Sequence, residues 1–308
     1  MSRKRGSLST IAIVLVGLVG VGMLLYPTVS DWWNTMHQSY AIAGYEHVVA
    51  EMDAGEQDRM IAEADAYNAE LARGGQRWYL DEEQTTEYEA LLNVTDTGIM
   101  GYVDIPKIDV TLPIYHGTSD AVLSVAIGHL AGTSLPVGGR GTHCCVSGHR
   151  GLPSARLFTD LDLLDEGDLF TFTVLDREAT YEVDQIRIVQ PDELDDLAID
   201  PKRDYATLVT CTPYGINSER LLVRGHRIDD APGAYTVLAD AVQIRPHLVA
   251  SVLGVPVVAM LLVWVMVATS RRESHRRAHE QMVGELRKRR VERESINGSS
   301  GEEDEHED

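Results

Sequence analysis

The sequence predicts a mainly β domain, a barrel or sandwich, that follows a helical extension and lies between two membrane-spanning helices. Three observations predict this architecture. Two long apolar runs without charged residues lie near the two ends of the chain, a stretch without proline that is rich in Ala and Glu covers 31–92, and short alternating apolar runs begin at residue 98.

The composition of the 308 residues excludes several classes of protein. Hydrophobic residues make up 44 %, which permits a large core and excludes wholesale disorder. The net charge of −21 argues against a nucleic-acid partner, because such a surface needs a basic face. Three cysteines are too few for a disulfide scaffold. Nearly all of the net negative charge falls within 27–247, whereas basic residues flank both apolar runs.

The first apolar run, Thr10–Tyr26, is seventeen residues long and follows the basic group Arg3–Arg5. This length is at the short limit for a helix that crosses a bilayer, and the run predicts an uncleaved membrane anchor. A cleavable signal peptide is the alternative, although Tyr26–Ser30 is a poor match to a cleavage site.

The second apolar run, Leu248–Thr269, has 22 residues and predicts a second membrane helix that tolerates Pro256. Arginines follow it directly, and basic flanks are cytoplasmic in membrane proteins. We therefore expect a cell-membrane protein in contact with lipid, with both termini in the cytoplasm and 27–247 outside. The acidic end of the chain predicts a disordered tail.

Apolar residues at alternating spacings of three and four within 31–92 predict two amphipathic helices, broken near Gly55 and ended by Gly74. From residue 98, apolar runs of five to ten residues are separated by Gly, Pro and Asp, which predicts seven or eight short strands. Ala121–His129 and Ser154–Leu164 are predicted as short helices between them.

Cys211 and His149 each end a predicted strand, next to a loop. A nearby imidazolium or guanidinium favours the thiolate, a guanidinium can stabilise an oxyanion, and His149 can protonate a leaving amine. Arg220 and Arg224 share a strand face about 13 Å apart, so only one of them can serve the same site as Cys211. Alternatively, Cys211 is a buried apolar residue and His149 is structural.

Long motifs carry a resemblance to a known family, and they lie in Gly98–Asp120, Gly128–Gly139, Gly141–Leu164 and Thr207–Arg227. They closely resemble the sortase family, and their residues resemble those of class C, the sortases that polymerise pilins. The resemblance covers about residues 85–230. The C-terminal apolar run also resembles class C, in which such a span is common.

The resemblance implies a closed sortase β-barrel of about eight strands with short helices. It implies that Cys211 is the nucleophile, that His149 is the catalytic histidine, and that Arg220, before Leu221-Leu222-Val223, is the catalytic arginine. The implied reaction cleaves an LPXTG-like signal of a pilin or surface protein between Thr and Gly and joins the acyl group to an amine, usually a pilin lysine. No cofactor or metal is implied.

The sequence departs from class C where that class carries a lid built on an Asp-Pro-aromatic motif. This chain has no proline between Pro27 and Pro106, so Trp78 and Tyr79 are the candidate lid residues instead. Alternatively, they pack against the barrel and there is no lid. Cys144 and Cys145 are interpreted as packed thiols, with redox control of Cys211 by Cys145 as the alternative.

Other functions stay open beside pilin polymerisation. A housekeeping sortase would attach proteins to a peptidoglycan precursor, and a cysteine peptidase would use water as the acceptor. A surface-interaction module without activity is a third class. The predicted segments are a cytoplasmic N-terminus (1–9), a span or signal anchor (10–26), a helical extension (27–97), the catalytic barrel (98–230), a linker (231–247), a second span (248–269) and a charged cytoplasmic tail (270–308).

Overall fold

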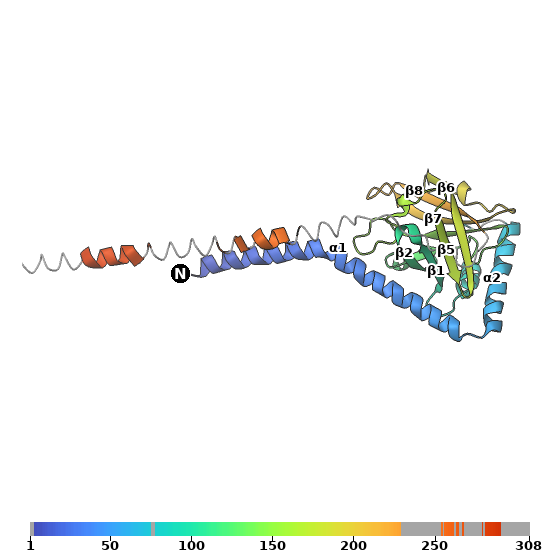
Figure 1. Ribbon diagram of the computed structural model, residues 1–308, viewed down its shortest axis with the longest axis horizontal. Helices are drawn as coiled ribbons and strands as arrows, with labels where there is room; N and C mark the ends of the chain where they lie inside the picture. The colour runs from blue at the N-terminus through green and yellow to red at the C-terminus, as the bar shows by residue number, and fades with distance from the viewer. Residues whose placement is uncertain are drawn as a thin grey trace, which may run out of the picture. The chain divides into compact units, whose positions relative to one another are not determined.

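Eight strands close into a barrel in the computed structural model, which describes residues 3–74, 78–228 and scattered residues between 254 and 290. The strands are β1 (Ile99–Ile105), β2 (Val110–His116), β3 (Ile127–His129), β4 (Thr142–Ser147), β5 (Leu169–Val174), β6 (Arg177–Val189), β7 (Asp204–Thr212) and β8 (Glu219–Arg227). Around the barrel their order is β1-β2-β3-β4-β7-β8-β6-β5 (Figure 1). The prediction of a closed barrel of about eight strands is confirmed.

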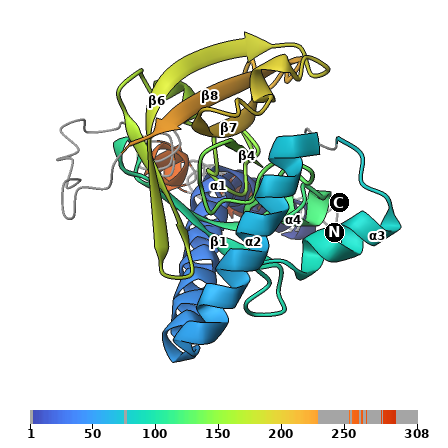
Figure 2. The same cartoon turned by 90° about the vertical axis from the view of Figure 1, so that its right-hand side faces the viewer.

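Two of the neighbouring strand pairs, β2 with β3 and β4 with β7, are parallel, and the others are antiparallel. The helices before and within the barrel region are α1 (Arg3–Glu51), α2 (Ala54–Gly74), α3 (Glu82–Ala90) and α4 (Asp120–Leu123), with 3₁₀ turns at Pro106–Ile108, Leu161–Leu163 and Asp195–Leu197. Figure 2 shows α2 and α3 on the outside of the barrel.

The chain divides into two compact units, one formed by Met1–Leu25 with Arg245–Asp308 and the other by Tyr26–Ile244, which holds the barrel. Within the described residues, α1 is the one helix long and apolar enough to cross a membrane, by length and composition. The second predicted span, Leu248–Thr269, lies largely outside the described residues, so the structure gives a two-span topology no support.

The helical extension matches its prediction in part. The break between α1 and α2 lies at Met52 and Asp53, close to the expected Gly55. From residue 38 onward, α1 turns a stripe of Gln38, Ile42 and Tyr45 into the protein, at spacings of four and three. The third helix, α3, is a difference from the predicted pair. Asp81 caps it in a reciprocal capping box with Gln84.

The predicted helix over Ala121–His129 is wrong in its second half. Helix α4 ends at Leu123, and Ile127–His129 forms the short strand β3, which pairs with β2 and β4. The pairing of this segment with two strands and its full burial favour a strand over the helix that the local sequence pattern predicts. In Ser154–Leu164, the other predicted helix, the structure has turns and a single 3₁₀ turn.

Alternation along the strands fills the barrel with apolar side chains. Phe170 of β5 and Tyr181 of β6 stack there, with ring centroids 5.5 Å apart. A Cβ added at Gly225 of β8 would lie 2.8 Å from the Phe170 ring, so this position needs glycine. The packed interior holds β7 and β8 in a unique register, since a shift of one residue would turn every buried side chain outward.

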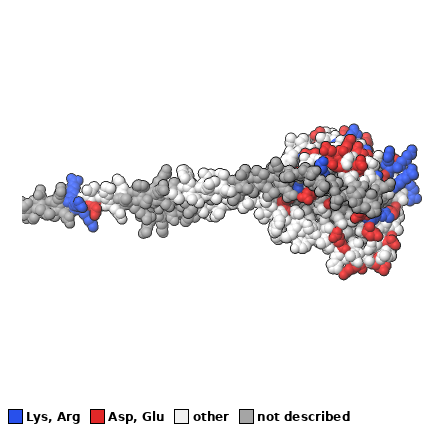
Figure 3. Space-filling model, in the orientation of Figure 1, with Lys and Arg blue, Asp and Glu red and all other residues white. Residues whose placement is uncertain are grey.

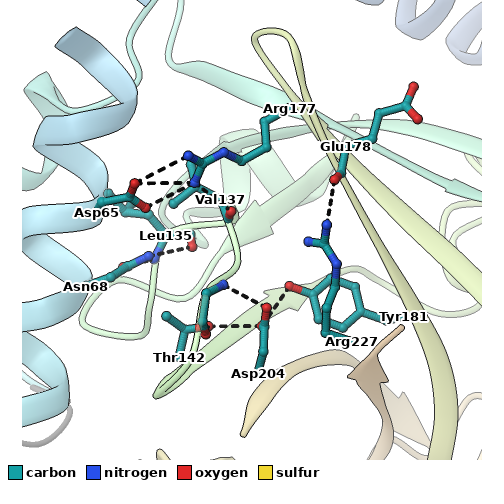
Figure 4. A network of polar contacts seen from close by, with 11 residues as sticks. Asp65, Asn68, Leu135, Val137, Thr142, Arg177, Glu178, Tyr181, Asp204 and Arg227 are labelled. Atoms are coloured by element: carbon teal, nitrogen blue, oxygen red, sulfur yellow. Dashed lines mark hydrogen bonds and ion pairs between the residues drawn. The ribbon is translucent and has the colours of Figure 1, made fainter. Parts of the chain in front are cut away.

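Polar contacts join α2 to the barrel (Figure 4). Asn68 and Leu135 exchange two hydrogen bonds, from the Asn68 amide to the carbonyl at 3.1 Å and from the Leu135 amide to the Asn68 side chain at 2.7 Å. One turn earlier, Asp65 forms an ion pair with Arg177 of β6 at 3.1 Å. Together these contacts fix α2 on the loop between β3 and β4 and on the start of β6.

Asp204, at the start of β7, holds the far end of the same loop (Figure 4). Its carboxylate accepts hydrogen bonds from the Gly139 amide, the Thr142 hydroxyl and the Tyr181 hydroxyl. Burial raises the pKa of Asp204, although these donors oppose the shift.

A buried histidine anchors α3. Tyr88 of α3 contacts His129 of β3 at 2.9 Å between its hydroxyl and Nδ1, and His129 Nε2 lies 2.8 Å from the Ser134 carbonyl. Burial lowers the pKa of His129 from 6.5 to about 4. The ring is therefore neutral at pH 7 and bridges α3 to the β3–β4 loop.

We predict that this unit loses stability in mild acid. In the unfolded chain His129 takes up a proton near pH 6.5, whereas in the folded chain it does so only near pH 4. The free energy of unfolding therefore falls as the pH drops from 6.5 to 4, by up to about 3 kcal/mol from this group. Denaturant unfolding of the chain in detergent at pH 7.5, 6 and 5 measures the change.

His129→Gln removes the titrating group, and its free energy of unfolding should vary less with pH than that of the wild type. The matched control is His47→Gln, which replaces an exposed histidine of α1 and tests whether the change is specific to the buried ring. Equal slopes for all three proteins would contradict the prediction.

Candidate active site

The three predicted site residues meet on one face of the barrel, where β4, β7 and β8 lie side by side. Cys211 of β7 pairs directly with Arg220 of β8. On the other side of β7, the last parallel pair is Ser147 with Val209, and the Gly148 amide donates to the Val209 carbonyl at 3.1 Å, so His149 comes directly after the last contact between β4 and β7. In order across the sheet, His149, Cys211 and Arg220 make up a row, in which the paired residues Cys211 and Arg220 share a face.

All three side chains are half-buried, and their polar contacts are few. Arg220 Nη1 donates to the carbonyls of Asn217 and Glu219, at 3.3 Å and 3.0 Å. In the part of the chain that the structure describes, Arg220 has no carboxylate partner, and neither the His149 ring nor the Cys211 thiol makes a hydrogen bond or ion pair. The guanidinium therefore keeps donors for a further ligand.

Residues that flank the cysteine and the histidine are also hydrogen-bonded to each other. The Thr210 hydroxyl donates to the Gly148 carbonyl at 2.7 Å, and Arg150 Nη1 donates to the Thr212 hydroxyl at 3.3 Å. The sequence points to these residues only through their position on either side of Cys211 and His149.

A small apolar cluster covers the same face next to the row. It consists of Cys145, Val189, Leu197, Val209 and Leu222, with Trp78, Leu130 and Leu194 packed against it. Val209 and Leu222 form the strand pair next to Cys211 and Arg220 on this face, two residues away along each strand. Trp78 therefore packs against the cluster that contains these two residues. The Tyr79 side chain is 95 % exposed, so of the two candidate lid residues only Trp78 packs on this surface.

Arg224, the other arginine on this face of β8, is occupied elsewhere. Its guanidinium forms two hydrogen bonds to the Asp184 carboxylate, at 2.9 Å and 3.1 Å, and lies 4.3 Å from the centroid of the Tyr205 ring. These contacts support a structural role for Arg224 and leave Arg220 as the arginine beside Cys211.

The remaining cysteines are buried, and burial raises the pKa of both thiols. Cys144 faces the barrel core, whereas Cys145 lies in the outer apolar cluster. Cys145 pairs with Thr207, four residues before Cys211, or about 13 Å along the strand. A disulfide needs Cα atoms within about 7 Å, so the alternative of redox control by Cys145 is wrong.

Acidic side chains are spread over the visible face of the Tyr26–Ile244 unit, with a group of basic side chains at one edge (Figure 3). The structure shows no group of three or more His, Cys, Asp or Glu side chains that could hold a metal within the residues it describes.

Comparison with known proteins decides the family. A family model described as a sortase domain matches residues 103–228. The crystal structure of sortase C1 from Streptococcus agalactiae is 50 % identical, with a TM-score of 0.61, and the match covers 62 % of this chain and 100 % of that one. The chain belongs to the sortase family. The expected resemblance to class C is confirmed, because solved sortase C structures match this chain at 50 % and 43 % identity.

Other sortases match over similar parts. Sortase C from Clostridium perfringens, solved with the C-terminal cell wall sorting motif, is 43 % identical over 62 % of this sortase and 100 % of that chain, with a TM-score of 0.56. Sortase D of Bacillus subtilis is 28 % identical over 42 % of this chain. The chain spans 63 % of the length of that curated relative.

We predict that a thiol reagent modifies one cysteine of the folded sortase. Cys211 is half-buried at a strand end, whereas Cys144 and Cys145 are inaccessible and carry raised pKa values. Iodoacetamide at pH 7.5, followed by intact mass measurement, should add one label to the wild type and none to Cys211→Ala. Denatured protein should take three labels. A native label on Cys145 would contradict the described packing.

Proposed function

We propose that this sortase is a cysteine transpeptidase in which Cys211, His149 and Arg220 act together. The observation that supports the proposal is the pairing of Cys211 with Arg220 on β7 and β8, together with the contact of Gly148, next to His149, with Val209 on the other side of β7. No other described cysteine has such neighbours at a strand end, since Cys144 and Cys145 are buried.

In the first half of the reaction, the Cys211 thiolate attacks the carbonyl carbon of the Thr–Gly peptide bond. The carbonyl oxygen becomes an oxyanion, which the Arg220 guanidinium stabilises. Among the described residues, Arg220 donates only to two backbone carbonyls, so no carboxylate competes with the oxyanion for its guanidinium. As the C–N bond breaks, the His149 imidazolium gives its proton to the leaving amine, and a thioacyl enzyme remains.

In the second half, an amine attacks the thioacyl carbon and the C–S bond breaks. The neutral His149 ring accepts the proton that the amine loses, which restores the imidazolium and the thiolate. The products are a new amide bond and the starting enzyme. No electron transfer occurs, and the proton that His149 gives to the leaving amine in the first half is replaced by the proton that it takes from the attacking amine in the second.

The proposed donor is a protein with an LPXTG-like signal, and the proposed acceptor is a lysine of a pilin subunit. The class C structures among the neighbours support this choice over a housekeeping sortase that uses a peptidoglycan precursor. The apolar floor of Val209 and Leu222, beside the cysteine, could accept the apolar residues of such a signal. The acidic surface suits an acceptor that presents lysine.

We predict that a pilin incubated with this sortase forms a ladder of covalent oligomers on a denaturing gel, and that Cys211→Ala abolishes it. Arg220→Lys should lower kcat by about 10²-fold, because one ammonium does not reproduce the guanidinium donors. The matched control is Arg187→Lys on the neighbouring strand β6, where the arginine pairs with Asp196. A ladder that persists in Cys211→Ala would sink the proposal.

The acceptor separates the alternatives in the same assay. A pilin polymerase should join subunits, whereas a housekeeping sortase should attach the pilin to a peptidoglycan-like amine. A peptidase would release the cleaved signal at a rate that hydroxylamine or a lysine donor leaves unchanged. Acceleration by an added amine, with the amine in the product, supports transpeptidation.

We further propose that Trp78 acts as a lid over the approach to Cys211. The support is its packing on the cluster that contains Val209 and Leu222. If this cover limits access, Trp78→Ala raises the rate at which iodoacetamide labels Cys211, and Tyr79→Ala does not, because Tyr79 is exposed. Equal labelling rates in the wild type and both variants would eliminate a lid at this position.

The proposed setting is the outer face of a cell membrane, with the barrel outside and both termini in the cytoplasm. The uncleaved first span within α1 and the second apolar run would anchor the protein at both ends. Protease added outside intact cells should then remove the barrel and spare the charged tail. Digestion of the tail from outside would refute this topology.

A further inference from the structure

Among the described residues, none orients the His149 ring through a hydrogen bond or ion pair of its side chain. In a catalytic triad, a carboxylate holds the histidine in place through a hydrogen bond. Within the described residues no hydrogen bond or ion pair reaches the His149 imidazole. The distance between the imidazole and the Cys211 thiol must therefore be set by the backbone on which each side chain stands, and so by whatever holds these two backbone segments together.

The first link between the segments precedes both residues. The ladder between β4 and β7 ends with the Gly148 amide, which donates to the Val209 carbonyl at 3.1 Å. The buried Thr210 hydroxyl then donates to the Gly148 carbonyl at 2.7 Å. Beyond this point the chain that follows β4 leaves the sheet, whereas β7 continues to Thr212 against β8, and the backbone pairing between β4 and β7 ends.

The second link follows both residues, and Arg150 forms it. Its Nη1 donates to the Thr212 hydroxyl at 3.3 Å, its Nε donates to the Thr159 carbonyl at 3.2 Å, and its Nη2 forms an ion pair with Asp162. The side chain is only 10 % exposed, so the surrounding water screens these contacts weakly. Thr212 is buried as well.

We propose that Arg150 and Thr212 are positioning residues that set the spacing between His149 and Cys211. The proposal rests on the proposed function, because it assigns His149 the proton transfers. Each of the two residues follows a catalytic residue directly in the chain, so the hydrogen bond between them closes a ring that contains both. The ring keeps the imidazole beside the thiol without a carboxylate partner and leaves both ring nitrogens free for proton transfer.

Both residue types suit this task. The planar guanidinium donates in three directions at once, to Thr212, Thr159 and Asp162, which the single ammonium of lysine does not reproduce. The Thr212 hydroxyl is the only group that this side chain offers to Arg150. Thr212→Val keeps the shape and removes the hydroxyl, whereas Thr212→Ser keeps the hydroxyl and removes a methyl group.

The test measures kcat, KM and backbone exchange in the full chain in detergent, for the wild type, Thr212→Val, Thr212→Ser and Arg150→Lys. We expect Thr212→Val to lower kcat on the order of 10-fold to 100-fold with KM within about twofold, because a small misplacement of a catalytic group slows the chemical step. Thr212→Ser should recover most of the kcat. The matched control is Thr180→Val, which removes a hydroxyl from a buried threonine of β6 that is bonded to Thr171.

Amide hydrogen exchange gives a readout that does not depend on activity. The Gly148 amide donates to Val209, and the Gly151 amide donates to the Thr159 hydroxyl, so both report on the segment that carries His149. Thr212→Val and Arg150→Lys should speed exchange in the peptide that contains both glycines, and Thr212→Ser and Thr180→Val should not.

Equal kcat and equal exchange in Thr212→Val and the wild type would overturn the proposal. So would equal losses in Thr212→Val and Thr212→Ser, because then the hydroxyl is irrelevant. Failure of the proposed function looks different, since the wild type and Cys211→Ala would give the same products. In that case the exchange measurement still decides whether the hydrogen bond from Arg150 to Thr212 holds the His149 segment.

Discussion

β4 and β7 run parallel in the wall of the barrel, and the candidate site depends on this pairing. A parallel pair cannot be joined by a tight turn, so the chain from Ser147 to Asp204 has to travel through β5 and β6 before it returns. In return, the C-terminal ends of both strands lie at the same end of the barrel. Two residues distant in the chain, His149 and Cys211, become neighbours there, and the hairpin partner β8 supplies Arg220 from the other side.

Buried hydrogen bonds keep the helical extension close to the site. Buried polar groups tie it to the β3–β4 segment at two points, through Asn68 of α2 and through Tyr88 of α3 with His129. A buried polar group without its partner is costly, so such contacts specify where each helix sits. Trp78 lies between the two anchors in the sequence, and this is how an aromatic residue remote from the barrel motifs comes to lie on the outer apolar cluster.

Local patterns predicted much of this fold, and long-range contacts account for the rest. The strands β4, β7 and β8 could be predicted because each has a clear alternating or apolar run. The roles of Cys211, His149 and Arg220 were implied by the long motifs that resemble the sortase family. The strand β3 was missed because its three residues owe their conformation to partners on both sides. Likewise, Arg150 is unremarkable until the fold places it beside Thr212, since the two are far apart in the sequence.

The packing of α1 bears on how a soluble form of this protein should be produced. The family match begins at residue 103, whereas the compact unit begins at Tyr26. Tyr45 is buried, and its hydroxyl donates to the Met100 carbonyl at 3.0 Å and accepts from the Leu175 amide at 2.7 Å. A fragment cut at the family limits would lose half of β1 and expose the surface that Tyr45 covers. Expression should therefore begin just after the membrane span, so that the barrel keeps the helix that seals it.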